Sequence, residues 1–252
     1  MTPVVSLEGV YKQFGGIVVA DDITLDIRRG EILGLIGPNG AGKTSLFNLI
    51  SGVYPTDAGS IHINGKSLDG LSLHQRARHG VTRTWQNIRL FGSLSVIDNL
   101  LVAPRAYPGE SLAWLALHPR RALANDKELR QRALAVLARV KLDALAEQSV
   151  GDIPFGQQKL IGLSRALMND GDCLLLDEPM AGVEGQAYET MKNIVREEAA
   201  AGRAVCVVEH NVSFIKDLCN SAMFMNNGKI LERGNIEQLL SSKTLAELYF
   251  GA

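Results

Sequence analysis

The feature that most constrains the fold is one glycine-rich segment, Gly37-Pro38-Asn39-Gly40-Ala41-Gly42-Lys43-Thr44-Ser45. It fits the pattern GxxxxGK[ST], with an apolar run at 32–36 before it and helical spacing from Lys43 to about Ile50 after it. Glycines allow the backbone to wrap closely around phosphates, and the N–H groups of a helix start then face the negative charge. The segment therefore predicts a strand, a phosphate-binding loop and a helix in succession.

Side chains of this segment and of a later acidic pair form a candidate site for a phosphate-bearing ligand and Mg²⁺. Lys43 would supply a positive charge to the β- and γ-phosphates, and Thr44 a hydroxyl to Mg²⁺. The apolar run 173–176 ends in Asp177-Glu178, and a buried strand that ends this way places its carboxylates at the carboxyl edge of the sheet. We expect Asp177 to hold Mg²⁺ and Glu178 to act as general base toward the attacking water.

Two more polar residues follow other short strands. His210 comes directly after AVCVVE and could donate a hydrogen bond to a γ-phosphate, while Gln86 lies in VTRTWQNIRLF. Taken alone, a histidine in such a place is more often structural, and a glutamine is normally a surface residue.

Apolar runs that alternate with helical patterns predict an α/β fold with a largely parallel sheet. Early strands are expected at Val4–Val10, Ile17–Ala20, Ile23–Ile27, Glu31–Ile36 and Ser60–Ile63. Residues 95–167 are rich in Leu, Ala and Arg, and the helical spacing of 125–142 favours a helical insertion. Later elements are expected as strands at Cys173–Leu176 and Ala204–Val208, helices at Gln186–Ala201 and Val212–Leu218, and a hairpin of 221–225 with 229–232.

Bulk composition narrows the class of protein. The net charge is -1, so the basic surface typical of nucleic-acid binders is not expected. Three scattered cysteines argue against a disulfide framework and favour a reducing compartment. We find neither a signal-peptide pattern nor a window of roughly 18 apolar residues, so we expect a cytoplasmic chain that reaches a membrane only through a partner. The basic run of Arg76, Arg78 and His79 is interpreted as a solvated turn.

Taken in their order along the chain, the glycine-rich segment, Gln86, the helical insertion, Asp177-Glu178 and His210 resemble the motifs of the ATP-binding-cassette (ABC) ATPases. The resemblance covers essentially the whole chain and implies one P-loop NTPase domain, 1–252. Its parts would be a RecA-like core with an N-terminal antiparallel β-subdomain, at about 1–94 and 168–252, and a helical subdomain at about 95–167 that carries the signature motif.

The resemblance also implies roles for single residues. Phe14 would stack on adenine, with Tyr11 as the alternative aromatic residue. Gln86 would contact Mg²⁺ and the γ-phosphate and couple them to a membrane partner. Glu178 would be the base and His210 the switch histidine, and residues 181–184 would form the D-loop.

The family's signature LSGGQ falls on Ile153-Pro154-Phe155-Gly156-Gln157, which would cap the γ-phosphate of ATP bound to an opposite subunit. Pro154 stands where the family usually has serine, and proline has neither a hydroxyl nor an N–H to donate. Proline does suit the first turn of a helix. Glu184 replaces the usual Asp or Asn at the end of the D-loop.

The stretch Thr82–Phe91 looks like the RTFQNIRLF segment of importer ATPases for branched-chain amino acids. That resemblance implies integral-membrane permease subunits, a second ATPase subunit (a different chain or a second copy) and, indirectly, a periplasmic or extracellular solute-binding protein. The chain would then lie on the inner face of the cell membrane. A urea or amide importer and a lipid or exporter system remain as alternatives. Residues 103–125 either dock a membrane partner or pack inside the helical subdomain.

Overall fold

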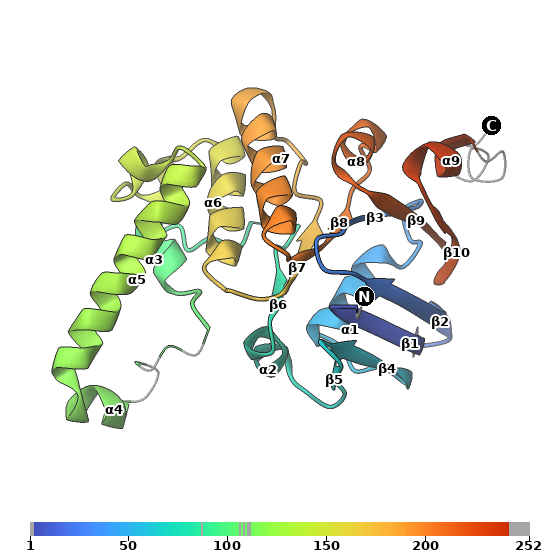
Figure 1. The fold of residues 1–252 in the computed structure, drawn as a ribbon, viewed down its shortest axis with the longest axis horizontal. Coiled ribbons are helices and arrows are strands. Elements are labelled where there is room, and N and C mark those ends of the chain that lie inside the picture. Colours follow the sequence, from blue (N-terminus) through green and yellow to red (C-terminus); the bar gives the residue numbers. More distant parts are fainter. Residues whose placement is uncertain (1–2, 87, 106, 108, 110–111, 242–252) are drawn as a thin grey trace. The chain divides into compact units, whose positions relative to one another are not determined.

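The computed structural model describes residues 3–86, 88–105, 107, 109 and 112–241. The chain divides into two compact units (Figure 1). The first takes in Met1–Gln86, Gly171–Ala181 and Val195–Ala252, and the second takes in Asn87–Asp170 and Gly182–Ile194. Three separate stretches of sequence therefore build the first unit.

A six-stranded sheet forms the centre of the first unit, in the order β10-β9-β3-β8-β7-β6. Strands β9, β3, β8, β7 and β6 pair in parallel, and β10 is antiparallel to β9. Every residue of β3, β7 and β8 is buried, which explains why these segments read as unbroken apolar runs. The strands are β3 Ile32–Ile36, β6 Val81–Arg83, β7 Cys173–Asp177, β8 Ala204–Val208, β9 Ser221–Asn226 and β10 Lys229–Gly234.

A four-stranded antiparallel sheet, in the order β2-β1-β4-β5, belongs to the same unit. Its strands are β1 Val5–Phe14, β2 Ile17–Ile27, β4 Ala58–Ile63 and β5 Lys66–Ser67. Helix α1, Lys43–Ser51, contacts β2 of this sheet and β6 and β7 of the other. Its buried Leu46, Phe47 and Leu49 fill the core there, so the helix that follows the glycine-rich loop is held by both sheets.

Strand β2 differs from the expectation of two separate strands at 17–20 and 23–27. It runs without a break because Asp22 adopts φ 54°, and the register shifts between the pairs Val10–Ile23 and Lys12–Ala20. Such a β-bulge absorbs extra residues within one strand. The Asp21-Asp22 pair therefore marks a bulge rather than a turn.

The prediction that Arg76 lies in a solvated turn is wrong. It belongs to α2, Leu73–Arg78, whose start is closed by a capping box of Ser72 and Gln75. The Arg76 side chain is buried, and its Nη1 donates to the carbonyls of Leu49, at 2.6 Å, and Ile50, at 3.2 Å. Arg76 thus satisfies carbonyls at the end of α1 that the helix itself leaves open. Helices α8, Val212–Leu218, and α9, Ile236–Ser241, complete the first unit.

The second unit is helical. Its main helix, α5, begins earlier than expected because Pro119 starts its first turn. Helix α3 packs against α5 and α6. The elements are α3 Val96–Leu101, α4 Leu112–Leu117, α5 Pro119–Arg139, the 3₁₀ turns Asp143–Leu145 and Val150–Asp152, α6 Phe155–Leu167, and the start of α7, Gly185–Ala200.

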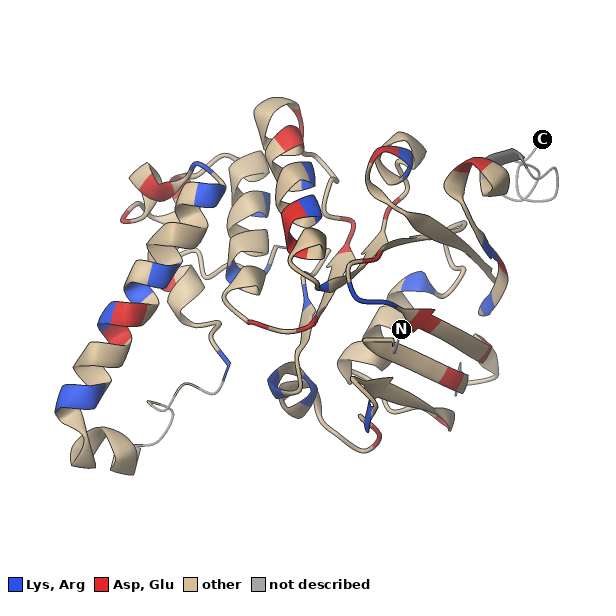
Figure 2. Ribbon diagram, in the orientation of Figure 1, with Lys and Arg blue, Asp and Glu red and all other residues tan. Residues whose placement is uncertain are grey.

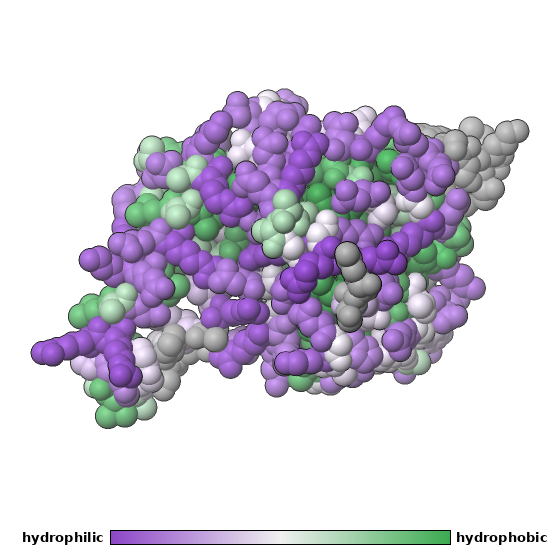
Figure 3. Space-filling view, viewed as in Figure 1, coloured by the Kyte–Doolittle hydropathy of each residue, from purple (hydrophilic) through white to green (hydrophobic). Residues whose placement is uncertain are grey.

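The surface of the second unit is mixed. The charged residues along α5 are mostly Lys and Arg, with Asp126 and Glu128 among them (Figure 2), and apolar atoms gather at α4 (Figure 3). Leu117 and Leu123 are exposed there, while Trp114 stacks on His118 with ring centroids 5.5 Å apart. Within 103–125, residues 106, 108, 110 and 111 lie outside the described part. Among the helices that are described, none combines the length and apolarity needed to cross a bilayer.

Candidate nucleotide site

The glycine-rich loop connects β3 to α1 and is fixed against two other strands. Gly37 has φ 153°, and a Cβ there would lie 2.0 Å from the carbonyl oxygen of Met225. Gly42 has φ 105°, and a Cβ there would lie 2.5 Å from the carbonyl oxygen of Val19. Only glycine fits such places, so the sequence pattern reflects close approach of the loop to β9 and β2.

Lys43 lies inside this loop. Its side chain is buried, and Nζ donates to the carbonyls of Gly37, at 2.7 Å, and Pro38, at 2.8 Å. Burial lowers the pKa of Lys43 below its ordinary value, while the charges of Glu178 and Asp177 act in the opposite direction. An ammonium group held this way can exchange carbonyl partners for phosphate oxygens without a large movement.

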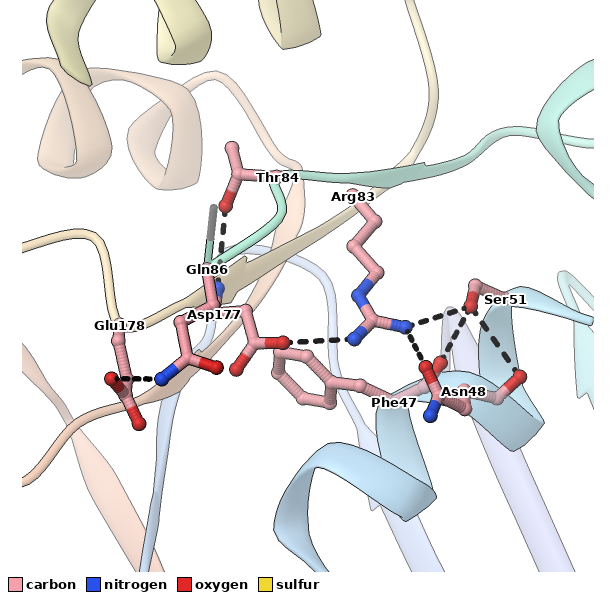
Figure 4. Close-up of polar contacts among 8 residues, drawn as sticks. All are labelled: Phe47, Asn48, Ser51, Arg83, Thr84, Gln86, Asp177 and Glu178. Carbon is pink, nitrogen blue, oxygen red and sulfur yellow. Dashed lines mark hydrogen bonds and ion pairs between the residues drawn. The ribbon is translucent and has the colours of Figure 1, made fainter. Parts of the chain in front are cut away.

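Asp177 ends β7 and is almost completely buried, at 2% exposure. Its Oδ2 accepts a bond from Arg83 Nη2 at 2.8 Å, and its backbone N–H donates to Thr84 Oγ1 at 3.2 Å (Figure 4). Its Oδ1 is buried and has no hydrogen-bond partner in the described part of the chain. Hard cations take oxygen ligands, so this open carboxylate oxygen and the exposed Thr44 hydroxyl in the first turn of α1 form a donor set that fits Mg²⁺.

Glu178 brings two other predicted residues together. Its Oε2 accepts from Gln86 Nε2 at 2.7 Å (Figure 4), and its Oε1 lies 3.0 Å from His210 Nε2. The three residues follow β7, β6 and β8, which are neighbours in the sheet. The carboxyl edge of this sheet thus gathers a carboxylate, an amide and an imidazole from three parts of the sequence, which is an arrangement suited to acid–base chemistry on water.

Sequence reasoning missed Glu209, which supports this group. Its side chain is buried, Oε1 accepts from the backbone N–H of Met180 at 2.7 Å, and Oε2 accepts from that of His210 at 3.2 Å. Burial raises the pKa of the Glu209 carboxyl, and bonds from the backbone N–H groups of Met180, His210 and Asn211 oppose that shift. An acidic residue directly after a wholly apolar strand was the available signal.

The aromatic candidates lie on β1. Phe14 is 40% exposed and meets Tyr54 edge-on, with ring centroids 5.0 Å apart. The ammonium of Lys12 lies 5.0 Å from the Phe14 ring. Tyr11 instead donates its hydroxyl to Gln13 Oε1 at 3.2 Å. Of the two rings, Phe14 is the one at the strand end, with a large exposed surface for a planar ligand.

The signature segment lies in the second unit, at the start of α6. Pro154 is the residue before the first turn, one position earlier than expected, and its carbonyl accepts from the N–H of Gln157 at 2.9 Å. Phe155 is 54% exposed, and a Cβ on Gly182 would lie 2.9 Å from its ring. Gly156 and Gln157 fall in the first turn of α6, where the first backbone N–H groups of a helix lack a partner within the helix, although that of Gln157 donates to Pro154.

Comparisons with known proteins place these features in one family. The family model described as ABC transporter matches residues 20–181. The chain is 31% identical to the high-affinity branched-chain amino acid transport ATP-binding protein BraF of Pseudomonas aeruginosa, over 99% of this chain and 98% of the relative. It is 30% identical to the corresponding LivG protein of Escherichia coli K12, again over 99% and 98%.

Solved structures agree. A nucleotide-free ATP-binding cassette from an ABC transporter superposes with a TM-score of 0.86 at 27% identity, and an ADP conformation of such a cassette with 0.85 at 27%, each covering 100% of both chains. The predicted fold class, a P-loop cassette with an antiparallel β-subdomain, is thereby confirmed. A match that extends over most of the sequence, joined to this fold, means that the chain belongs to the ABC transporter family as one of its ATP-hydrolysing cassette subunits.

Proposed function

We propose that this chain powers an importer for branched-chain amino acids or a related small polar or carboxylate solute. The support is the end-to-end similarity to BraF and LivG, whose names state branched-chain amino acid transport. Its partners would be integral-membrane permease subunits, a second cassette, and indirectly a solute-binding protein outside the cell. The chain would lie on the inner face of the membrane through the permease, and the exposed Leu117 and Leu123 near α4 are candidates for that contact.

The observation that carries the proposed mechanism is the carboxylate of Glu178 held between Gln86 and His210. Phe14 would stack on adenine, and the loop 37–45 would hold the phosphates through its N–H groups and Lys43. Thr44, Asp177 and Gln86 would hold Mg²⁺, which when bound neutralises phosphate charge.

Glu178 then accepts a proton from the water that attacks the γ-phosphorus. His210 and Gln86 donate to the Glu178 carboxylate before ATP arrives and to the γ-phosphate or its water afterwards. The bond that breaks joins the γ-phosphorus to the β–γ bridging oxygen, so ADP leaves with that electron pair and phosphate retains the oxygen of the water.

The signature segment 154–157 acts on ATP held by a second cassette in this proposal. Because Pro154 offers no donor, the ATP site that it completes loses one bond to a charged group, about 1.5–3 kcal/mol. In a heterodimer the site built on this chain's own Lys43 and Glu178 would therefore be the faster one. Equal loss of activity on disabling the loop lysine of either subunit would contradict that asymmetry.

Reconstitution with the permease, the partner cassette and a solute-binding protein tests the function. ATP-dependent uptake of labelled leucine is expected, and Glu178→Gln should reduce it at least a hundredfold because the proton acceptor is lost. Glu232→Gln, an exposed change on β10, is the matched control. Urea or acetamide uptake without leucine uptake would favour the amide importer, and export alone would refute import.

A further inference from the structure

One buried arginine links the two halves of the nucleotide site; it lies in the importer-like stretch Thr82–Phe91, but the proposed mechanism gives it no role. Arg83 is the last residue of β6, and its side chain is 4% exposed. Its Nη2 bonds Asp177 Oδ2 at 2.8 Å. On the other side its Nη1 bonds Asn48 Oδ1 at 2.7 Å and Ser51 Oγ at 3.1 Å, both on α1 (Figure 4). One guanidinium thus bridges the helix after the phosphate loop and the end of β7.

Aromatic rings hold the plane of this guanidinium. Its Cζ lies 4.4 Å from the centroid of the Trp85 ring and 5.6 Å from that of Phe47. A planar fork can stack on such rings and donate in two directions at once, which a lysine ammonium cannot do in the same geometry. The cluster therefore requires arginine rather than a positive charge alone.

Two consecutive residues, Arg83 and Thr84, hydrogen-bond to Asp177 at its side chain and at its backbone. Arg83 holds its carboxylate, and Thr84 Oγ1 accepts from its backbone N–H at 3.2 Å. A bond to Oδ2 stops rotation of the carboxylate, and this leaves Oδ1 as the buried oxygen without a partner in the described part of the chain. The orientation of the open oxygen follows from the arginine contact.

We propose that Arg83 is the positioning residue of the metal site: it aims Asp177 Oδ1 at the cation that accompanies ATP and fixes it relative to α1. In this proposal the guanidinium acts only through Asp177 and α1 and does not itself contact nucleotide or cation. This inference rests on the proposed role of Asp177 as a cation ligand. Residues that orient metal ligands typically change metal affinity 10–100-fold when replaced.

A purely electrostatic role and a positioning role of Arg83 predict opposite changes in cation affinity when Arg83 is replaced. If the guanidinium acted only as a nearby positive charge, its removal in Arg83→Met would strengthen cation binding, because like charges repel. If it positions Asp177, both Arg83→Met and Arg83→Lys weaken cation binding, because neither side chain retains the fork. The sign of the change therefore separates the two explanations.

The test measures ATP affinity with excess Mg²⁺ and with EDTA, in the Glu178→Gln background so that ATP survives. The readout is the dissociation constant of ATP measured in EDTA divided by the one measured with Mg²⁺. Arg83→Lys and Arg83→Met should lower this ratio about tenfold, with the EDTA value unchanged within about twofold. Arg78→Lys, an exposed basic change on α2, is the control and should leave the ratio unchanged.

A second readout uses Trp85. The chain has two tryptophans, so Trp114→Phe leaves Trp85 as the only one, and Mg²⁺·ATP should shift its emission with Arg83 present but not in Arg83→Lys. If Arg83→Met does not fold, the same ratio is measured for Arg83→Lys and for the double variant Asn48→Ala, Ser51→Ala.

Three results would overturn the inference: an unchanged ratio in Arg83→Lys, stronger cation binding in Arg83→Met, or equal weakening of ATP binding with and without Mg²⁺, which would make Arg83 purely structural. The variant Asp177→Asn tests the proposed cation role of Asp177 separately from the inference about Arg83. If that change leaves the ratio unaltered, the proposed cation role of Asp177 fails, independently of Arg83.

Discussion

Two glycines of the phosphate loop provide a matched pair for testing how closely the loop packs. Gly40 and Gly42 both have positive φ, at 79° and 105°. A Cβ on Gly40 would meet nothing within 4 Å, whereas one on Gly42 would lie 2.5 Å from the carbonyl oxygen of Val19 and 2.8 Å from the Met225 methyl carbon. Substitution by alanine therefore adds backbone strain at both sites and a collision at only one.

The expected losses in the free energy of unfolding follow from the backbone strain and from the collision. A non-glycine residue in the left-handed region costs on the order of 1–3 kcal/mol, which both variants incur. Forcing a methyl group into filled space costs typically another 1–3 kcal/mol, and here part of the obstacle is backbone. We expect Gly40→Ala to lower the free energy of unfolding by about 1–3 kcal/mol and Gly42→Ala by about 2–6 kcal/mol, so the collision accounts for a gap of about 1–3 kcal/mol.

Urea unfolding of the nucleotide-free protein, followed by circular dichroism, measures the difference. With a denaturant slope of about 2–3 kcal/mol/M, a gap of about 1–3 kcal/mol moves the midpoint by roughly 0.3–1.5 M. Nucleotide is left out because it would stabilise whichever variant still binds it. A Gly42→Ala midpoint equal to that of Gly40→Ala would refute the close packing of the loop on β2.

Three other outcomes are expected. Arg76→Met should lower the free energy of unfolding by about 2–4 kcal/mol, because buried α1 carbonyls lose their donor, and thermal unfolding against the exposed Arg78→Met checks it. Ser72→Ala should cost about 1 kcal/mol through loss of the capping box. Because burial lowers the pKa of Lys43 below its ordinary value and phosphates raise it, ATP binding should take up protons at alkaline pH. Calorimetry in buffers of different ionisation enthalpy measures this uptake, which Lys43→Arg should abolish.

The parts of the fold that were predicted well are those set by neighbouring residues. Strand β3, the glycine-rich loop and α1 appear where expected because an apolar run, glycines and helical spacing follow one another directly. Strand β8 matches its predicted bounds, Ala204–Val208, for the same reason: a wholly buried strand is an apolar run with polar ends. Information of this kind is carried within about ten residues of sequence.

The parts that could not be predicted depend on partners far away in the chain. Arg83 is buried because Asp177, which lies 94 positions later, neutralises it. Arg76 is buried because the end of α1, some 26 positions earlier, needs donors. Neither a basic residue before a short strand, as Arg76 is, nor one at its end, as Arg83 is, carries a local sequence signal that predicts burial. The cluster at Asp177 therefore became visible only in three dimensions.

The neighbouring carboxylates Asp177 and Glu178 show how the backbone separates two roles. Successive residues of a strand point to opposite faces, so continuing β7 by one residue would direct the second carboxylate away from the loops of the adjacent strands. Glu178 leaves the strand with φ 47°, in the region that side chains other than glycine rarely adopt. That turn lets it reach Gln86 and His210 while Asp177 stays buried against Arg83. The strain, of order 1–3 kcal/mol, thus lies at the one residue where two adjacent acids must serve different partners.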